Sequence, residues 1–135
     1  MINNQIIKIA SNTKHSGLLN IFTHKSSIKN SLCGDFIKVE LVAYKNKIKS
    51  MRYETESCVL CEASASLLAK KVKNLSLKDL KKDIIFLKEI KKNKKFNFPP
   101  RYKEFKQILN QNTLKRANCV ILPFDAIIKA FKFKK

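Results

Sequence analysis

Five residues in this sequence have side chains that could bind a metal ion together, and they lie in three short segments. Cysteine occurs four times in 135 residues: at Cys33, at Cys58 and Cys61, and at Cys119. Asp35 adds a carboxylate two residues after the first cysteine. Thiolates bind Zn²⁺ and iron–sulfur clusters, and zinc also accepts a carboxylate oxygen. The residue types and their clustering therefore indicate metal or redox chemistry.

The residues around each cysteine predict how it is positioned. Gly34 allows a sharp bend of the backbone directly after Cys33. Cys58 opens an expected helix, and the positive end of the helix dipole stabilises an anionic thiolate. Cys119 is also expected near the start of a helix, because Pro123 favours the first turn. All three positions suit a ligand or a nucleophile.

A β-hairpin is expected between Cys33 and Cys58. Residues 36–44 alternate in character, which marks a half-buried strand; one face carries Ile37, Val39, Leu41 and Ala43, and the other Lys38 and Glu40. Residues 48–55 predict the second strand, with residues 45–47 as the turn. The hairpin has Cys33 at its entry and Cys58 at its exit, so both are expected at one end of the sheet.

The remaining segments predict one more strand and several helices. The strand is expected at residues 18–22 or at residues 26–29, and Ser76 with Asp79 forms a capping box. Apolar residues suggest helices at residues 2–12 (with Ile6, Ile7 and Ile9 on the apolar side), after Cys58, at 77–90, at 102–109 and around 126–131. We expect one α+β domain over residues 1–135, with a three-stranded antiparallel sheet packed on one side by about four to five helices.

The formal net charge of +19 is the property that would suggest nucleic-acid binding. Only three of the 29 basic residues are arginine, the side chain that best reads phosphates and base edges, and the lysines are spread along the whole chain. We interpret the charge as a solvated surface, with an acidic partner as the alternative, and expect neither nucleic acid nor membrane as partner. The N-terminal residues lack a secretory pattern, so a cytoplasmic protein with reduced thiols is expected.

Three motifs, in this order, resemble the iron–sulfur cluster assembly scaffolds of the IscU/NifU-like family. They are LCGD at residues 32–35, SCVLCEASAS at residues 57–66 and RANCVILP at residues 116–123. The likeness covers about residues 33–131. The long interval before Cys119, and an arginine three residues ahead of it, resemble the SufU-like branch most. The IscU branch has a histidine directly before the last cysteine, where this chain has Asn118.

The resemblance implies the NifU-like scaffold fold and a role for each site residue. Cys33, Asp35, Cys58 and Cys119 would bind Zn²⁺ or a labile iron–sulfur cluster, [2Fe–2S] or [4Fe–4S]. One thiolate would accept sulfane sulfur from a SufS-like cysteine desulfurase, with Cys33 as first candidate and Cys119 as second. Arg116 would stabilise thiolate charge or contact the desulfurase. The protein would be a scaffold or a zinc-dependent sulfurtransferase rather than a conventional enzyme, and would serve a downstream assembly complex or apo-proteins.

Two departures from the family pattern leave alternatives open. Ser57 stands where the family has glycine, and Cys61 is either a small buried side chain or an alternative ligand or redox partner. The C-x-x-C spacing of Cys58 and Cys61 also occurs in thiol–disulfide oxidoreductases, although that fold requires a βαβ unit. A basic zinc module for nucleic acid is a third class, but it lacks paired ligand sets. His15 and His24 are expected at the surface.

Overall fold

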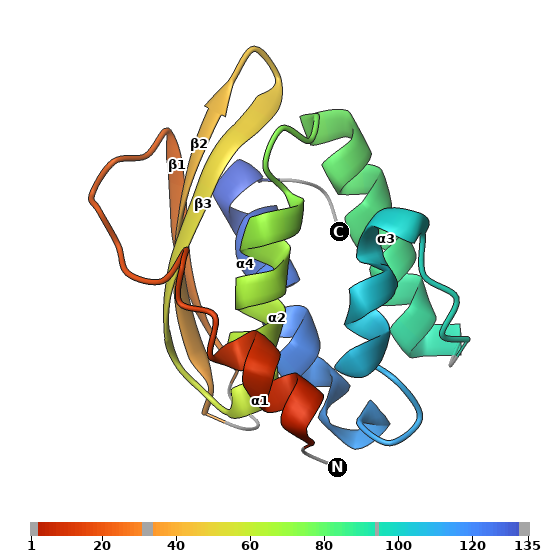
Figure 1. Ribbon diagram of the computed structural model, residues 1–135. Coiled ribbons are helices and arrows are strands. Elements are labelled where there is room, and N and C mark those ends of the chain that lie inside the picture. The colour runs from red at the N-terminus through yellow and green to blue at the C-terminus, as the bar shows by residue number, and fades with distance from the viewer. Residues whose placement is uncertain (1–2, 31–33, 94, 133–135) are drawn as a thin grey trace.

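A computed structural model of the protein describes residues 3–30, 34–93 and 95–132. In chain order the described elements are α1 (Asn4–Ala10), β1 (His24–Lys29), β2 (Phe36–Tyr44), β3 (Lys47–Glu56), α2 (Val59–Lys71), α3 (Leu77–Asn93), the 3₁₀ helices η1 (Pro100–Gln107) and η2 (Leu114–Arg116), and α4 (Ala117–Phe131). The strands form one antiparallel sheet in the order β1–β2–β3. Figure 1 shows the sheet with the helices on one side of it, which confirms the predicted α+β fold.

The β2–β3 hairpin places two of the predicted site residues at one end of the sheet. Its turn has two residues, Lys45 and Asn46, with φ angles of +51° and +63°. Positive φ at both positions is typical of the type I′ turns that match the twist of the strands. The turn is thus one residue shorter than predicted, and Lys47 belongs to β3. At the opposite end the last pair is Phe36 with Glu56, so Asp35 and Cys58 lie just beyond it.

The structure decides between the two predicted positions of the first strand. β1 covers His24–Lys29, so the second of the two predicted positions is right. Residues 18–22 instead form part of a loop that covers the outer face of the sheet (Figure 1). There the backbone N–H groups of Leu19 and Asn20 donate to Glu40 Oε1 over 2.8 and 3.0 Å. Glu40 points away from the main core as predicted, but this loop leaves it only 5% exposed.

The helix α2 lies at the centre of the helical layer and is buried around most of its circumference. It contacts α1, α4 and β3, which is possible because residues 63–66 have small side chains. Two of these are serines whose hydroxyls donate to neighbouring carbonyls: Ser64 to Val120 over 2.6 Å, and Ser66 to Asn12 over 2.9 Å. Buried hydroxyls need such acceptors. The small residues therefore join three elements closely without leaving polar atoms unpaired.

Three helical predictions need correction. Ile7 is 48% exposed, because α1 is short and buries Ile6 and Ala10, one turn apart, on its inner face. The predicted helix at 102–109 is the 3₁₀ helix η1, in which Tyr102 has non-helical backbone angles. Pro123 lies inside α4 rather than in its first turn. Among the described residues, no helix combines the length and apolar character that crossing a bilayer requires.

The predicted capping residue of α3 provides a test of local stability. Ser76 Oγ accepts the backbone N–H of Asp79 over 3.1 Å. We expect Ser76→Ala to lower the free energy of unfolding by about 1 kcal/mol, the usual value of such a cap. Urea unfolding followed by circular dichroism measures it. Ser27→Ala is the matched control, because Ser27 is exposed on β1 and its hydroxyl has no hydrogen bond within the described residues. Equal losses in both variants would contradict the capping role.

Candidate metal centre

Asp35 provides a buried carboxylate at the start of β2. It is 6% exposed, and its Oδ1 accepts the backbone N–H of Cys58 over 3.2 Å. The other oxygen, Oδ2, is buried and has no hydrogen-bond partner within the described residues. A buried carboxylate oxygen without a donor is costly and calls for a cation or another donor. One oxygen of Asp35 therefore fixes the side chain, while the second is available for a ligand bond.

Cys58 lies between the end of β3 and the start of α2. It is the N-cap residue of α2, with φ −72° and ψ 165°, but its side chain makes no capping hydrogen bond. The thiol is half-buried and lies at the helix end where backbone N–H groups are unpaired. The partial positive charge there favours a thiolate and a negatively charged cargo.

Cys119 comes from the opposite side, as the third residue of α4. It is 3% exposed, and two hydrogen bonds anchor the part of α4 that follows it. The carbonyl of Val120 accepts the Ser64 hydroxyl, and the carbonyl of Ala126 accepts the Ser26 hydroxyl, each over 2.6 Å. These bonds join α4 to α2 and to β1. They hold the Cys119 sulfur at a defined place opposite the hairpin.

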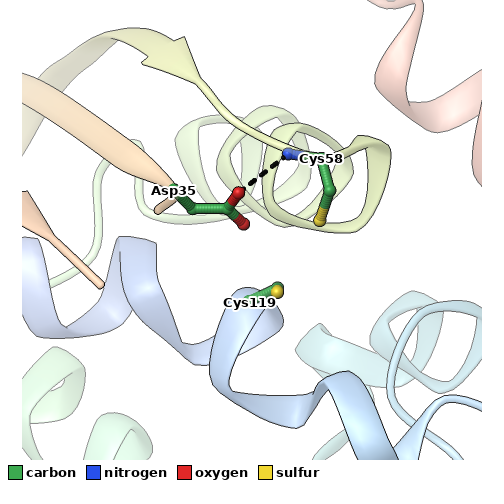
Figure 2. Close-up of side chains that lie close together, drawn as sticks. All are labelled: Asp35, Cys58 and Cys119. Carbon is green, nitrogen blue, oxygen red and sulfur yellow. Dashed lines mark hydrogen bonds between the residues drawn. The ribbon is translucent and has the colours of Figure 1, made fainter. Parts of the chain in front are cut away.

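The three side chains meet in one place. The Asp35 carboxylate and the sulfurs of Cys58 and Cys119 offer donor atoms that all lie within 4.8 Å of one another. Figure 2 shows them turned toward one another from the starts of β2, α2 and α4. Donor atoms around tetrahedral zinc lie about 3.3–3.8 Å apart. The widest separation in the group thus exceeds that of a closed zinc site by at most roughly 1 Å.

Arg116, the last residue of η2, lies beside this group. The charge of Cys58, a hydrogen bond with Cys119 and the charge of Asp35 all raise the pKa of the Arg116 guanidinium. A cation at this position offsets the negative charge of two thiolates and a carboxylate. Asn118, at the position where the IscU branch carries histidine, is exposed.

The four predicted ligands therefore have different outcomes. Asp35, Cys58 and Cys119 lie together, whereas Cys33 is outside the described residues, so its role stays a prediction. Next to it, Gly34 has φ +75° and donates its N–H to Asn30 over 2.7 Å. Sequence patterns did not reveal that the backbone N–H of Cys58 orients Asp35, although both residues were expected at the same end of the hairpin.

Cys61 belongs to the apolar core. It is fully buried and is not part of the donor group formed by Asp35, Cys58 and Cys119. Of the two interpretations from the sequence, the structure supports the small buried side chain. The topology argues against a C-x-x-C oxidoreductase, because the described strands pair only antiparallel and form no βαβ unit. Cys58, Cys61 and Cys119 are all thiols.

Comparison with known proteins places this chain in a family. A family model described as the NifU-like N-terminal domain matches residues 1–129. A NifU-like protein (N-terminal) from Brucella abortus has a similar structure, with a TM-score of 0.83, 21% identity and coverage of 96% of this chain and 91% of that one. A candidate iron–sulfur cluster assembly scaffold for the SUF system, from Fervidobacterium islandicum AW-1, gives a TM-score of 0.75, 18% identity and coverage of 96% and 95%.

No curated protein matches the chain. The identities to the solved structures are low, so these structures establish the fold, whereas the family model covers almost the whole sequence. Both agree with the family resemblance found in the sequence. The chain belongs to the NifU-like N-terminal domain family.

Proposed function

We propose that this protein is a scaffold on which iron–sulfur clusters are assembled, at the site formed by Asp35, Cys58 and Cys119. The observation that carries the proposal is the meeting of two sulfurs and one carboxylate oxygen within 4.8 Å. The buried Oδ2 of Asp35, which has no hydrogen-bond partner among the described residues, supports it independently. Family membership and the fold shared with a SUF-system candidate scaffold point to the same function.

Cys33 supplies the fourth donor in this proposal. It stands two residues before Asp35, in the connection between β1 and β2. Three thiolates and one carboxylate form a set that Zn²⁺ accepts and that also binds an iron–sulfur cluster. A hard carboxylate holds soft iron–sulfur chemistry less tightly than a fourth thiolate. Such a site suits a cluster that is cargo, to be handed to an apo-protein.

Sulfur reaches the site as a persulfide in this proposal. The acceptor thiolate attacks the terminal sulfur of the persulfide on a cysteine desulfurase; the S–S bond of that persulfide breaks, and the desulfurase leaves as a thiolate. Cys119 is only 3% exposed, which makes it a poor target for the active-site loop of another protein. Its burial favours Cys33 as acceptor. Arg116 offsets the negative charge at the site during the transfer.

The partners follow from this chemistry: a SufS-like cysteine desulfurase upstream, and an assembly complex or apo-proteins downstream. The described cysteines are thiols, and a reducing compartment such as the cytoplasm would keep them so.

Cluster assembly in vitro tests the function. Metal-free protein is incubated without oxygen with ferrous iron, cysteine, reductant and a catalytic amount of a SufS-like desulfurase. We expect visible absorption from sulfur-to-iron charge transfer, which decays as an added apo-ferredoxin gains its own signal. Reactions without desulfurase, and with the Asp35→Ala variant, are the controls. A wild-type protein that never gains the absorption, although its sulfur acceptor becomes persulfidated, would contradict the scaffold function and favour a sulfurtransferase.

A further inference from the structure

A second site lies at the opposite end of α2 from Cys58. There a cavity of about 300 Å³ is formed by the loop after α1, by β3 and by the end of α2. Its basic lining residues are Lys14, His15, Lys49, Arg52 and Lys73. Among the residues that the structure describes, no aspartate or glutamate lines it. Five basic side chains from three separate segments therefore converge on one small space.

The basic side chains of this cavity form no ion pair within the described residues. The ion pairs of the described chain join Lys71 to Glu104, Lys88 to Asp125 and Arg101 to Asp83. None of these residues lines the cavity. Glu40, which is opposite Arg52 in the sheet, accepts two backbone N–H groups from the covering loop. All three guanidinium nitrogens of Arg52 donate to backbone carbonyls of residues 14–17: to Gly17 and Lys14 over 3.0 Å each, and to Ser16 over 2.5 Å. The guanidinium is thus held in place by neutral acceptors, and it contributes its positive charge to the potential of the cavity.

His15 reports the positive potential of the cavity. Its pKa is lowered by burial and then by the charges of Lys14, Arg52 and Lys73. Each of these residues lines the same cavity. Protonation of the histidine ring is therefore disfavoured, and a bound anion would offset the part of this effect that comes from the neighbouring charges.

The strand edge at the cavity is built in an unusual way. β3 is an edge strand, and its edge is covered at Tyr53 by residues 15–17 and at Ile48 by residues 74–75. Between these points Lys49 is an extra residue that has no partner in the β2–β3 register, as in a β-bulge. Bulges redirect side chains and often lie beside binding sites. Here the bulge coincides with the open stretch of edge that faces the cavity.

The cavity also has an apolar side. Leu19 and Ile21 line it and are 57% and 67% exposed, among the most exposed large apolar residues of the described chain. A ligand that covered them would remove apolar surface from water. The carbonyl end of α2 lies nearby and opposes an anion, but its partial charge is only about half an elementary charge. The charges of Lys14, Lys49, Arg52 and Lys73 together exceed this partial charge.

We propose that this cavity binds a phosphomonoester, with the phosphate among Lys14, Lys49, Arg52 and Lys73, and a small apolar or aromatic group on Leu19 and Ile21. A dianion matches the uncompensated charge, and Arg and Lys are the side chains that bind phosphate. The volume admits a phosphate with one ring. This binding is independent of the metal site, since Cys58 and Lys73 lie at opposite ends of α2.

Titration with phenyl phosphate at low, fixed ionic strength tests the proposal. NMR signals of the histidine rings are followed with pH, with and without ligand. We expect the pKa of His15 to rise when phenyl phosphate binds, while the signals of His24 stay unchanged as an internal control. Inorganic phosphate should bind more weakly and phenol not at all. Absence of phosphate binding, or equal responses of His15 and His24, would overturn the proposal.

Two double variants distinguish binding of phenyl phosphate in this cavity from its non-specific attraction to surface lysines. Lys49→Gln with Lys73→Gln removes two charges from the cavity, and we expect phenyl phosphate affinity to fall about tenfold or more. Lys25→Gln with Lys38→Gln removes two exposed charges from a different cavity on the outer sheet face, which also contains Glu40. That control should change affinity less than about threefold. Equal losses in the two variants would overturn the proposed site.

Discussion

Replacing Cys119 with alanine should abolish stoichiometric metal binding. Asp35→Ala and Cys58→Ala should do the same, because each removes one donor of a group that lies within 4.8 Å. Loss of a residue that merely orients a ligand weakens metal binding about 10–100-fold, so loss of a ligand itself should weaken it by more than about 100-fold. Competition with a chromophoric chelator measures zinc affinity, and elemental analysis measures metal content.

Cys61→Ala is the matched control for these variants. It removes a thiol only three residues from Cys58, but one that is buried in the apolar core. We expect full metal content and wild-type affinity in this variant, with a small loss of stability. Circular dichroism establishes that every variant remains folded. Wild-type zinc affinity in folded Cys119→Ala would show that Cys119 is not a ligand.

Replacing Phe124 with alanine should lower the free energy of unfolding more than Ser76→Ala or Phe86→Ala does. Phe124 is 1% exposed on α4, and its ring lies 5.4 Å from that of Phe105 in η1. Removing a buried aromatic ring leaves a cavity and typically costs about 3–5 kcal/mol. Urea unfolding of the metal-free protein measures the change, because bound metal would add its own stabilisation.

Phe86→Ala is the control for the aromatic ring. Phe86 is 44% exposed on α3, so its truncation removes little buried surface and should cost less than about 1 kcal/mol. Equal losses for Phe86→Ala and Phe124→Ala would contradict the core assignment. Because α4 also carries Cys119, we further expect Phe124→Ala to weaken zinc binding without removing a ligand.

The sequence predicted the elements whose patterns are local. The alternation in residues 36–44 predicted β2 with its observed bounds, and the change to helical spacing after Cys58 predicted α2. The pattern in β2 records burial on alternate residues, whereas α2, which is buried around most of its circumference, was marked by the change of period after Cys58. The hairpin then fixed Asp35 and Cys58 at one end of the sheet. The hairpin and the family motifs together predicted that the proposed ligands lie near one another, and the structure shows this for Asp35, Cys58 and Cys119.

The features that the sequence did not predict depend on contacts between distant segments. Glu40 is covered because a loop twenty residues earlier donates two N–H groups to it. Pro123 fits inside α4, where no general rule would place it. The basic cavity combines Lys14, Lys49 and Lys73, which were expected to belong to an evenly charged surface. A local pattern contains no information on such convergence.

X-ray absorption at the zinc edge of the zinc-loaded protein tests the central claim most directly. The proposed site predicts three sulfur ligands at about 2.3 Å and one oxygen or nitrogen ligand at about 2.0 Å. In Asp35→Ala, the spectrum of any zinc that remains bound should lose the contribution of the carboxylate oxygen. Cys61→Ala should give the wild-type spectrum. A wild-type spectrum with fewer than three sulfurs, or one that is lost in Cys61→Ala, would contradict the assignment of Cys33, Cys58 and Cys119 to a single centre.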